Sequence, residues 1–301
     1  MSHVPVMSRE ALEILRPSPG KLYIDCTLGS GGHSAQILAA VQGKARILGI
    51  DRDPEALERS RDRLREYGSQ VTYVRDDFRN LREIVHEQGI SGADGIIFDF
   101  GVSSPQVDSP ERGFSYLHDA PLDMRMDPSQ GKTAAEIVNT WPEAGIARLI
   151  RQFGEERWAH RIAKFVVARR EIEPISTTGQ LVEVIKAAIP AGARRTGPHP
   201  AKRTFQALRI VVNDELPAIA GGLRQVPCVL NEGGAVVAIS FHSLEDRIVK
   251  QTFRDMVQAG DLIAVTRKPV VPGPQEIEEN PRARSAKLRA ARKVLKAGEV
   301  E

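Results

Sequence analysis

The sequence predicts an α/β protein with a Rossmann-like core, a doubly wound parallel sheet, interrupted by an inserted all-helical domain. Short apolar runs alternate with helix-like segments over the first hundred residues, which is typical of parallel strands covered on both faces. The next apolar run, Ala235–Ile239, begins 135 positions after Phe100. One strand–helix–strand unit needs about 30 residues, so roughly a hundred are left for an insertion.

The first part of the core is predicted to hold four strands with helices between them. The strands are residues 21–25, 45–50, 71–74 and 95–98. A glycine-rich turn follows the first strand, and Asp51 and Asp99 close the second and the fourth. Pro54 predicts the start of the next helix, because the fixed φ angle of proline suits the first helical turn.

The segment between the two parts of the core shows the apolar spacing of helices. Ile146, Leu149, Ile150 and Phe153 follow the spacing i, i+3, i+4, i+7 of an amphipathic helix. Farther along, Thr178 is predicted to cap a helix.

The insertion sets the predicted domain boundaries. The two parts of the core cover 1–108 and 206–301, and the inserted helical domain covers 109–205. Ala201–Leu216 is predicted to return to the core as its crossover helix.

The last part of the chain adds further core elements. After the strand 235–239, Ser243 and Asp246 form a predicted capping box at the start of a helix. Leu262–Val265 is predicted to be a sixth strand. Ser285–Ala291 stays open between strand and helix, because its apolar residues alternate while its helix propensity is also high.

Composition excludes several classes of protein. The 301 residues are 41% hydrophobic and 27% charged, which supports one large or two modest domains and argues against disorder. The apolar runs are too short to span a membrane, and the start lacks the layout of a signal peptide. Two cysteines, Cys26 and Cys228, exclude a disulfide scaffold. We therefore expect a cytoplasmic protein.

Positive charge is concentrated in two segments. Residues 281–301 carry seven Lys/Arg against two Glu, and residues 190–210 carry five Lys/Arg and no acid. The formal net charge of the whole chain is only +3, so the rest is acidic. Basic segments on an acidic body indicate a polyanionic partner, with a solvated surface and a frayed tail as the alternative.

The glycine-rich turn predicts a nucleotide site. Gly29, Gly31 and Gly32 lie between the first strand and its helix, where backbone and free N–H groups approach a ligand closely. Asp51, at the end of the second strand, stands where a carboxylate accepts hydrogen bonds from ribose hydroxyls. The dinucleotide fingerprint fails at Ser34. This favours an adenosine cofactor without a pyrophosphate, S-adenosylmethionine, over a plain tight turn.

A second motif, Asp99–Gln106, follows the fourth strand. Methylation of an exocyclic amine needs oxygen acceptors that hold the N–H groups, together with close alignment of the reactants. Asp99, Ser103 and Ser104 offer such oxygens, and Pro105 stiffens the loop. These four residues are our candidate catalytic set, with an ordinary strand-to-loop turn as the alternative.

With these motifs in place, the sequence resembles the RsmH (formerly MraW) family of 16S ribosomal RNA (cytosine-N4)-methyltransferases. Matching runs extend over almost the whole chain in order. They are residues 3–7, 25–34, 49–54, 99–106, 110–114, 121–127, 199–209, 240–247 and 280–289.

The resemblance implies an S-adenosylmethionine-dependent methyltransferase core whose inserted helical domain recognises the substrate. It implies N4-methylation of one cytosine in the decoding region of 16S ribosomal RNA, within the small ribosomal subunit. Carried over by position, the cofactor contacts would be Gly31, Gly32, His33, Asp51, Phe78, Asp99 and Gln106. Phe78 has an equal alternative as a core residue, and Asp99 could serve either the cofactor or the cytosine amine.

Seven residues are candidates for the substrate side: Arg112, Phe114, Asp123, Arg125, Lys202, Arg203 and His242. Asp123 and Arg125 could hold a phosphate or simply pair in a loop. His242 could touch RNA or help to begin its helix. Phe114 and Phe241 are candidates to stack on the target base, because Gln106 leaves the 103–106 loop without an aromatic residue.

Two other functions compete with the methyltransferase. One is a nicotinamide-dependent oxidoreductase that uses the same glycine loop, against which Ser34 already counts. The other is a non-catalytic ribosome-binding factor. No metal is assigned, since His160 and His199 lack partners at ligand spacing. A homodimer is compatible with the sequence, although no heptad or long apolar stripe requires one.

Overall fold

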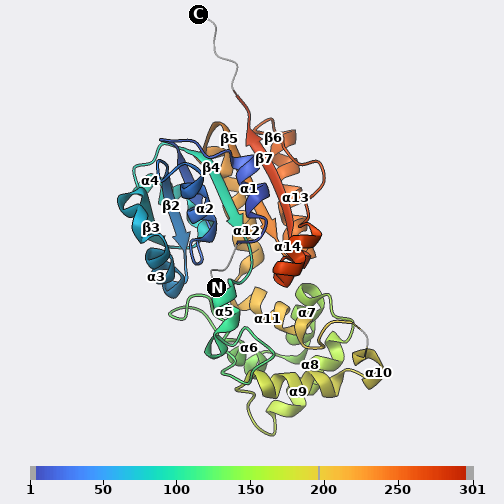
Figure 1. The fold of residues 1–301 in the computed structure, drawn as a ribbon. Coiled ribbons are helices and arrows are strands. Elements are labelled where there is room, and N and C mark those ends of the chain that lie inside the picture. The colour runs from blue at the N-terminus through green and yellow to red at the C-terminus, as the bar shows by residue number, and fades with distance from the viewer. Residues whose placement is uncertain (1–4, 196, 296–301) are drawn as a thin grey trace, which may run out of the picture. The chain divides into compact units, whose positions relative to one another are not determined.

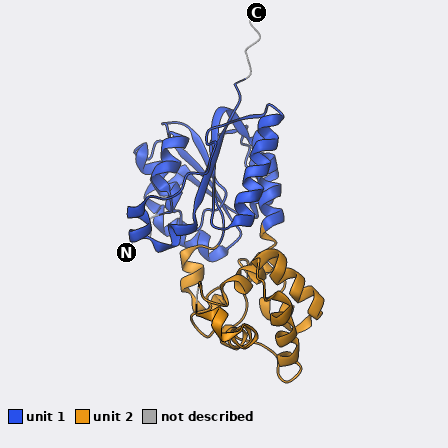
Figure 2. Cartoon of the chain, turned by 90° about the vertical axis from the view of Figure 1, so that its right-hand side faces the viewer, with its two compact units in different colours: residues 1–101, 216–301 blue, residues 102–215 orange. Residues whose placement is uncertain are grey.

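The structure is a computed structural model that describes residues 5–195 and 197–295 (Figure 1). The start of the first matching run, His3 and Val4, and the end of the basic tail, including Lys296, lie outside the described residues. The chain divides into two compact units (Figure 2). The sheet unit comprises residues 1–101 and 216–301, and the helical unit comprises residues 102–215.

Seven described strands form the single sheet of the sheet unit, in the order β3-β2-β1-β4-β5-β7-β6. The first five are parallel neighbours, and β7 runs antiparallel to both β5 and β6. This order of the parallel strands is that of a doubly wound nucleotide-binding sheet. The strands are β1 Leu22–Asp25, β2 Arg46–Asp51, β3 Val71–Arg75, β4 Ala93–Asp99, β5 Leu230–Ser240, β6 Leu262–Ala264 and β7 Lys287–Lys293.

Helices cover both faces of this sheet (Figure 1). One face is packed under α1 Ser8–Leu15, α2 Gly32–Ala40 and α3 Pro54–Arg63. The other is packed under α4 Leu81–Glu87, α12 Glu215–Val229 and α13 Ser243–Gln258. The short helix α14 Pro274–Glu279 precedes β7. Within the described part of the chain, no helix has the length and apolar character needed to cross a bilayer.

Local sequence signals account for where several of these elements begin. The Asp53 side chain accepts a hydrogen bond from the backbone N–H of Glu55, which caps α3 ahead of Pro54. The predicted capping box of α13 is displaced by one residue. His242 is the cap, and the Glu245 carboxylate accepts from the N–H groups of Phe241 and His242 at 2.7 and 3.2 Å. The open segment 285–291 is a strand, because β7 inserts between β5 and β6.

The helical unit has its own apolar core. Its described helices are α5 Ser104–Asp108, α6 Ala134–Thr140, α7 Glu143–Gly154, α8 Ala159–Arg170, α9 Thr178–Ala188, α10 Ala191–Arg194 and α11 Lys202–Val212. Thr177, rather than the predicted Thr178, caps α9. The Thr178 hydroxyl instead bonds to the loop before it, accepting from Ala120 N–H and donating to the His118 carbonyl.

The prediction that Ala201–Leu216 is the crossover helix of the core is wrong. α11 packs against α7, and Phe205, Ala207 and Leu208 belong to the core of the helical unit. The following helix, α12, supplies the crossover instead, since its apolar side packs on the sheet. The helical unit therefore extends over 102–215, whereas 109–205 was predicted. The amphipathic pattern of α11 shows that it has a buried face but does not say which core buries it.

Phe205→Ala tests this placement of α11. Phe205 is 3% exposed, and truncating such a side chain costs about 3–5 kcal/mol of unfolding free energy. We expect native-state hydrogen exchange to show lost protection in α7 and α8, while β1 and β4 keep theirs. Lost protection in the strands alone would indicate that α11 packs on the sheet instead.

Candidate functional site

Three aspartates end three neighbouring parallel strands. Asp51 closes β2, Asp25 closes β1 and Asp99 closes β4, and β1 pairs with both of the other strands. Parallel strands present their carboxyl ends at the same edge of a sheet, which is where ligands bind in open α/β folds. The three carboxylates therefore define one edge of the sheet unit.

The glycine-rich loop between β1 and α2 is tied to all three strand ends. Gly29 N–H donates to Asp51 Oδ2 at 2.8 Å, and the Ser34 hydroxyl donates to Asp25 Oδ2 at 2.8 Å. The backbone N–H of Asp99 donates to Thr27 Oγ1 at 2.6 Å. A short loop with three such anchors has little freedom, so its backbone is held ready for a ligand.

Glycine is required at two positions of this loop. Gly29 and Gly31 have φ angles of 52° and 73°, in the left-handed region that side chains disfavour. Gly31 precedes α2 as its cap residue and has no side chain to cover the first N–H groups of the helix. Those N–H groups point out of the helix start, which favours a polar or anionic ligand there.

Two buried polar atoms beside this loop have no hydrogen-bond partner among the described residues: His33 Nε2 and Asp99 Oδ1. The other Asp99 oxygen lies 3.5 Å from His33 Nε2. Buried polar atoms without partners are costly and are usually satisfied by something that binds. Together with the glycine loop and Asp51, they fit a cofactor that carries ribose hydroxyls and a polar tail.

Burial dominates the electrostatics of this edge. Loss of water raises the pKa of Asp25, and raises the pKa of Asp51 to about 6 despite the N–H groups of Asp53 and Gly29 that lower it. Burial opposes protonation of His33, but the carboxylates of Asp99 and Asp25 raise its pKa above the ordinary value. The two carboxylates therefore outweigh the effect of burial on His33.

Phe78 lies in an aromatic cluster of the sheet unit. Its ring meets Phe98 edge-on at 5.7 Å between centroids and is tilted against Phe100 at 5.9 Å. A side chain at Gly222 of α12 would collide with it, since an added Cβ would lie 2.7 Å from Phe78 Cδ2. Phe78 keeps a partly exposed surface, so its core packing does not use the whole ring.

In the helical unit, the candidate catalytic loop forms the start of α5. Ser103 precedes the helix, Ser104 and Pro105 are its first residues, and the buried Gln106 closes the turn. Gln106 Oε1 accepts the Ser103 N–H at 2.9 Å. Pro105 and this side-chain bond together fix the loop. The Gln106 side-chain oxygen thus stabilises the loop, and the contact of Gln106 to the cofactor stays a prediction.

Four candidates for the substrate side build a loop of the helical unit. Arg112 is buried and donates to the carbonyls of Arg125 and Met126 at 3.1 and 2.9 Å. Phe114 is in the core, 5.9 Å from the Arg112 guanidinium. Arg125 forms a two-point pair with Asp123, at 2.9 and 2.7 Å. This is the loop-pairing alternative, although Asp123 and Arg125 stay partly exposed.

Several cations of the predicted basic tail form ion pairs or hydrogen bonds within the sheet unit. Arg289 and Lys287 bind Asp246 at 2.7 and 3.3 Å, Arg292 donates to the Gly233 and Ile14 carbonyls, and Lys293 donates to those of Pro227 and Leu230. These cations hold β7 in the sheet. The expectation that segment 281–301 as a whole grips phosphates is therefore corrected, because net charge does not distinguish free cations from paired ones.

The segment 190–210 keeps more of its charge at the surface. Lys202 and Arg203 are exposed at the start of α11, where Arg203 also donates to the Glu155 carbonyl at 2.8 Å. Arg209, in contrast, is paired with Glu215 at 2.8 and 2.9 Å.

A group of exposed cations at the start of α8 was missed by sequence reasoning. Arg161 and Lys164 lie on one side of the helix, Arg157 precedes the helix by two residues, and all three are exposed. The Arg157 guanidinium lies 5.2 Å from the Trp158 ring, and that of Arg161 lies 5.4 Å from Phe165. The signal was present in the sequence, since α8 contains no acidic residue. Arginines interleaved with aromatic rings suit single-stranded nucleic acid.

His242 takes the helix-starting role. It caps α13, and its Nε2 lies 3.1 Å from the buried carboxylate of Glu245. Its position directly after β5 still places it at the carboxyl edge of the sheet.

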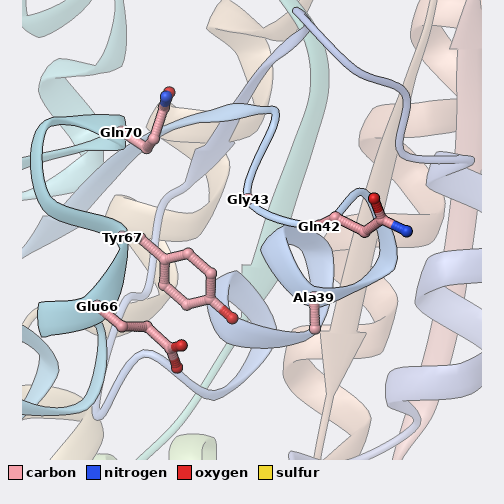
Figure 3. Close-up of a pocket in the computed structure, with 6 residues that line it drawn as sticks. All are labelled: Ala39, Gln42, Gly43, Glu66, Tyr67 and Gln70. Atoms are coloured by element: carbon pink, nitrogen blue, oxygen red, sulfur yellow. The ribbon is translucent and has the colours of Figure 1, made fainter.

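A surface pocket lies elsewhere, where the end of α2 meets the 3₁₀ turn Arg65–Gln70 (Figure 3). Ala39, Gln42, Gly43, Glu66, Tyr67 and Gln70 line it. These residues precede β2 and β3 in the chain, so the pocket is at the amino edge of the sheet. It is therefore separate from the loop that Asp25, Asp51 and Asp99 anchor.

Comparisons with known proteins match nearly the whole chain to one family. A sequence model described as the MraW methylase family matches residues 1–294. The ribosomal RNA small subunit methyltransferase H of Symbiobacterium thermophilum is 53% identical, over 99% of this chain and 98% of its own. The enzyme of the same name from Heliobacterium modesticaldum is 49% identical, over 97% and 98%. Among solved structures, NSun6 from Pyrococcus horikoshii aligns with 97% of this chain and 53% of its own at 14% identity, with a TM-score of 0.49.

Asp51→Asn tests whether the buried, ionised Asp51 carboxylate destabilises the fold. A carboxylate whose pKa rises on folding destabilises the fold when ionised, and that cost is present above pH 6 and disappears as the pH falls toward 4. The amide of Asn keeps one of the two oxygens that accept the Gly29 and Asp53 N–H groups, so the variant loses a hydrogen bond at every pH. Relative to the wild type, we therefore expect its unfolding free energy to be about 1–2 kcal/mol more favourable at pH 8 than at pH 5. Urea unfolding at both pH values measures this, and an equal change at both would refute it.

Proposed function

The chain belongs to the MraW methylase family, and on that premise we propose that it methylates N4 of one cytosine in the decoding region of 16S ribosomal RNA. Relatives that share about half of its residues over nearly its full length are small-subunit ribosomal RNA methyltransferases, and this chain is an S-adenosylmethionine-dependent enzyme of that class. The observation that carries the proposal is the anchored glycine loop beside Asp51 and Asp99. Family membership sets aside the oxidoreductase alternative.

The proposed cofactor contacts come from the carboxyl edge of the sheet unit. Asp51 accepts hydrogen bonds from the ribose hydroxyls, and the N–H groups of Gly31, Gly32 and His33 at the start of α2 face the polar tail. Phe78 offers the exposed part of its ring to the adenine. When bound, S-adenosylmethionine supplies an electrophilic methyl group on a sulfonium.

Asp99 has the central part in the proposed chemistry. Its Oδ1 is a buried acceptor with no partner among the described residues, and His33 Nε2 lies 3.5 Å from the other oxygen. An acceptor fixed in this way holds an amine N–H and turns the nitrogen lone pair toward the electrophilic carbon. Ser103, Ser104 and Pro105 follow within six residues of Asp99 along the chain and are the proposed further contacts to the amine.

The proposed RNA contacts come from the helical unit. Exposed cations on and just before α8 and at the start of α11 supply charge for backbone phosphates: Arg157, Arg161, Lys164, Lys202 and Arg203. The partly exposed pair Asp123–Arg125 remains a candidate for a base or phosphate contact. The substrate is taken to be 16S ribosomal RNA assembled in the small subunit, in the cytoplasm, and the proposal does not require a homodimer.

The decisive experiment supplies labelled S-adenosylmethionine to small ribosomal subunits that lack the modification. We expect label in 16S RNA, recovered as N4-methylcytidine by mass spectrometry of the nucleosides. Asp99→Asn should reduce transfer by at least 100-fold, because a neutral amide holds the amine more weakly and in the wrong donor–acceptor sense. Label on another nucleoside, or in protein, would reject the proposed specificity.

Cofactor affinity should depend on pH through Asp51. Only the ionised carboxylate is a charge-assisted acceptor, and its pKa is about 6. Binding of S-adenosylhomocysteine should therefore be about tenfold weaker at pH 5 than at pH 8. Calorimetric titration of the Asp51→Asn variant separates the effect of Asp51 on affinity from that of His33. The variant should bind S-adenosylhomocysteine weakly, and its affinity should no longer change with pH through residue 51. A variant with wild-type affinity would remove Asp51 from the site.

A further inference from the structure

Two aromatic rings of the helical unit form a stacked pair that the proposed function does not use. The rings of Tyr116 and His199 are nearly parallel, at 10°, and their centroids are 4.6 Å apart. Tyr116 also meets the ring of Phe205 edge-on at 5.7 Å. Phe205 is in the core of the helical unit, whereas Tyr116 and His199 are both partly exposed. The pair therefore extends from the core to the surface of this unit.

His199 is the member of the pair with a ring face to offer. Tyr116 covers one face of the imidazole, so a ligand could reach the opposite face and the edge. The ring of Tyr116 lies between His199 and Phe205. Tyr116 therefore supports the imidazole from the side of the core.

Hydrogen bonds hold the His199 ring in place. Its Nδ1 accepts the Ala201 N–H at 3.3 Å, and its carbonyl accepts the Lys202 N–H at 3.0 Å. Burial and the Lys186 ammonium lower the pKa of His199, so the ring is neutral at pH 7. A neutral ring that is oriented in advance loses little entropy when another flat ring packs on it.

The charge around this ring comes from the segment 190–210, which has five Lys/Arg and no acid. Acidic residues are exposed on the neighbouring elements, namely Asp119 in the loop after Tyr116 and Glu183 on α9, where Glu183 pairs with Lys186 at 2.9 Å. Positive charge is therefore confined to the segment that carries His199. Four exposed cations flank His199 along this segment: Arg194, Arg195, Lys202 and Arg203.

A flat ring among exposed cations is typical of sites that hold unpaired nucleotides. The bases stack on the aromatic rings, and the cations bind the adjoining phosphates. Phe114, which the sequence suggested as a stacking residue, is only 8% exposed and belongs to the core. A buried ring has no face for a base, whereas His199 has one.

We propose that an unpaired base of the RNA substrate stacks on the outer face of His199, with Tyr116 supporting the imidazole from behind. This inference rests on the proposed function, because it adds a base contact for the same RNA. The contact selects an unpaired nucleotide by its π-face and tolerates any base. The exposed cations of segment 190–210 bind the phosphates on either side of that nucleotide.

Two substitutions in the full chain separate stacking from hydrogen bonding. His199→Asn keeps a side-chain acceptor for the Ala201 N–H and removes the ring, whereas His199→Phe keeps a ring and removes the acceptor. His86→Asn is the matched control, because His86 is exposed on α4 of the sheet unit. Equal thermal midpoints and equal affinity for S-adenosylhomocysteine would establish that the variants fold and keep the cofactor site.

Binding to a mixed-sequence single-stranded RNA is then measured against salt. Loss of one stacked base should weaken binding of His199→Asn by about 5- to 150-fold, while His199→Phe and His86→Asn should bind about as well as the wild type. The slope of log K against log salt should not change in His199→Asn, because a neutral ring displaces no counterions. Lys202→Gln should lower that slope by about 0.7. With unmodified small subunits, His199→Asn should raise KM and leave kcat unchanged.

A measurement on the wild type keeps the test valid if a variant is unstable. The Hε1 proton of His199, identified by its absence from the spectrum of His199→Phe or His199→Asn, should shift upfield when RNA is added, because the ring current of a stacked base shields it. The Hε1 signal of His86 should stay in place.

Wild-type RNA affinity in His199→Asn, or an unmoved Hε1 signal at saturating RNA, would overturn the proposal. Equal losses in His199→Asn and His199→Phe would also overturn it, since they would not follow the presence of a ring. Failure of the proposed function is distinguishable from these outcomes. In that case the wild type itself transfers no methyl group to small subunits, whereas the RNA measurements still report whether a base stacks on His199.

Discussion

Parallel pairing of β2, β1 and β4 is the constraint on which the rest of this site depends. Each strand ends in an aspartate, and the pairing registers bring the three ends to one edge. Asp25, Asp51 and the backbone of Asp99 then hold the glycine loop at three points. Without the sheet, the loop would be an ordinary flexible turn, and its N–H groups would have no fixed direction.

This arrangement is not the most stable one available to the fold. Burial raises the pKa of Asp25 and of Asp51, which means that the ionised carboxylates oppose folding at neutral pH. His33 Nε2 and Asp99 Oδ1 add buried polar atoms without hydrogen-bond partners in the described chain. Costs of this kind are concentrated at functional sites, where a ligand satisfies the groups that the fold leaves open.

Positive charge has two different uses in this chain. In β7, Arg289, Arg292 and Lys293 bind an aspartate and backbone carbonyls, so they secure the strand between its neighbours. On α8, the exposed Arg161 and Lys164 leave positive charge on the outward side of the helix. Only the second arrangement leaves charge accessible to a polyanion, and these surface cations are therefore among those proposed to bind RNA.

Local sequence determined much of this protein: the parallel sheet, the glycine turn, Asp51 and Asp99 at the ends of their strands, and the helical insertion. Apolar periodicity and turn residues act over a few positions, and so these features are readable without the fold. The amphipathic α11 could not be assigned to a core, and β7 could not be told from a helix, because each choice depends on partners that are distant in sequence. The uses of Arg112, Arg289 and His242 were likewise decided by tertiary structure, since a charged side chain is free or paired only in relation to the groups that folding brings beside it.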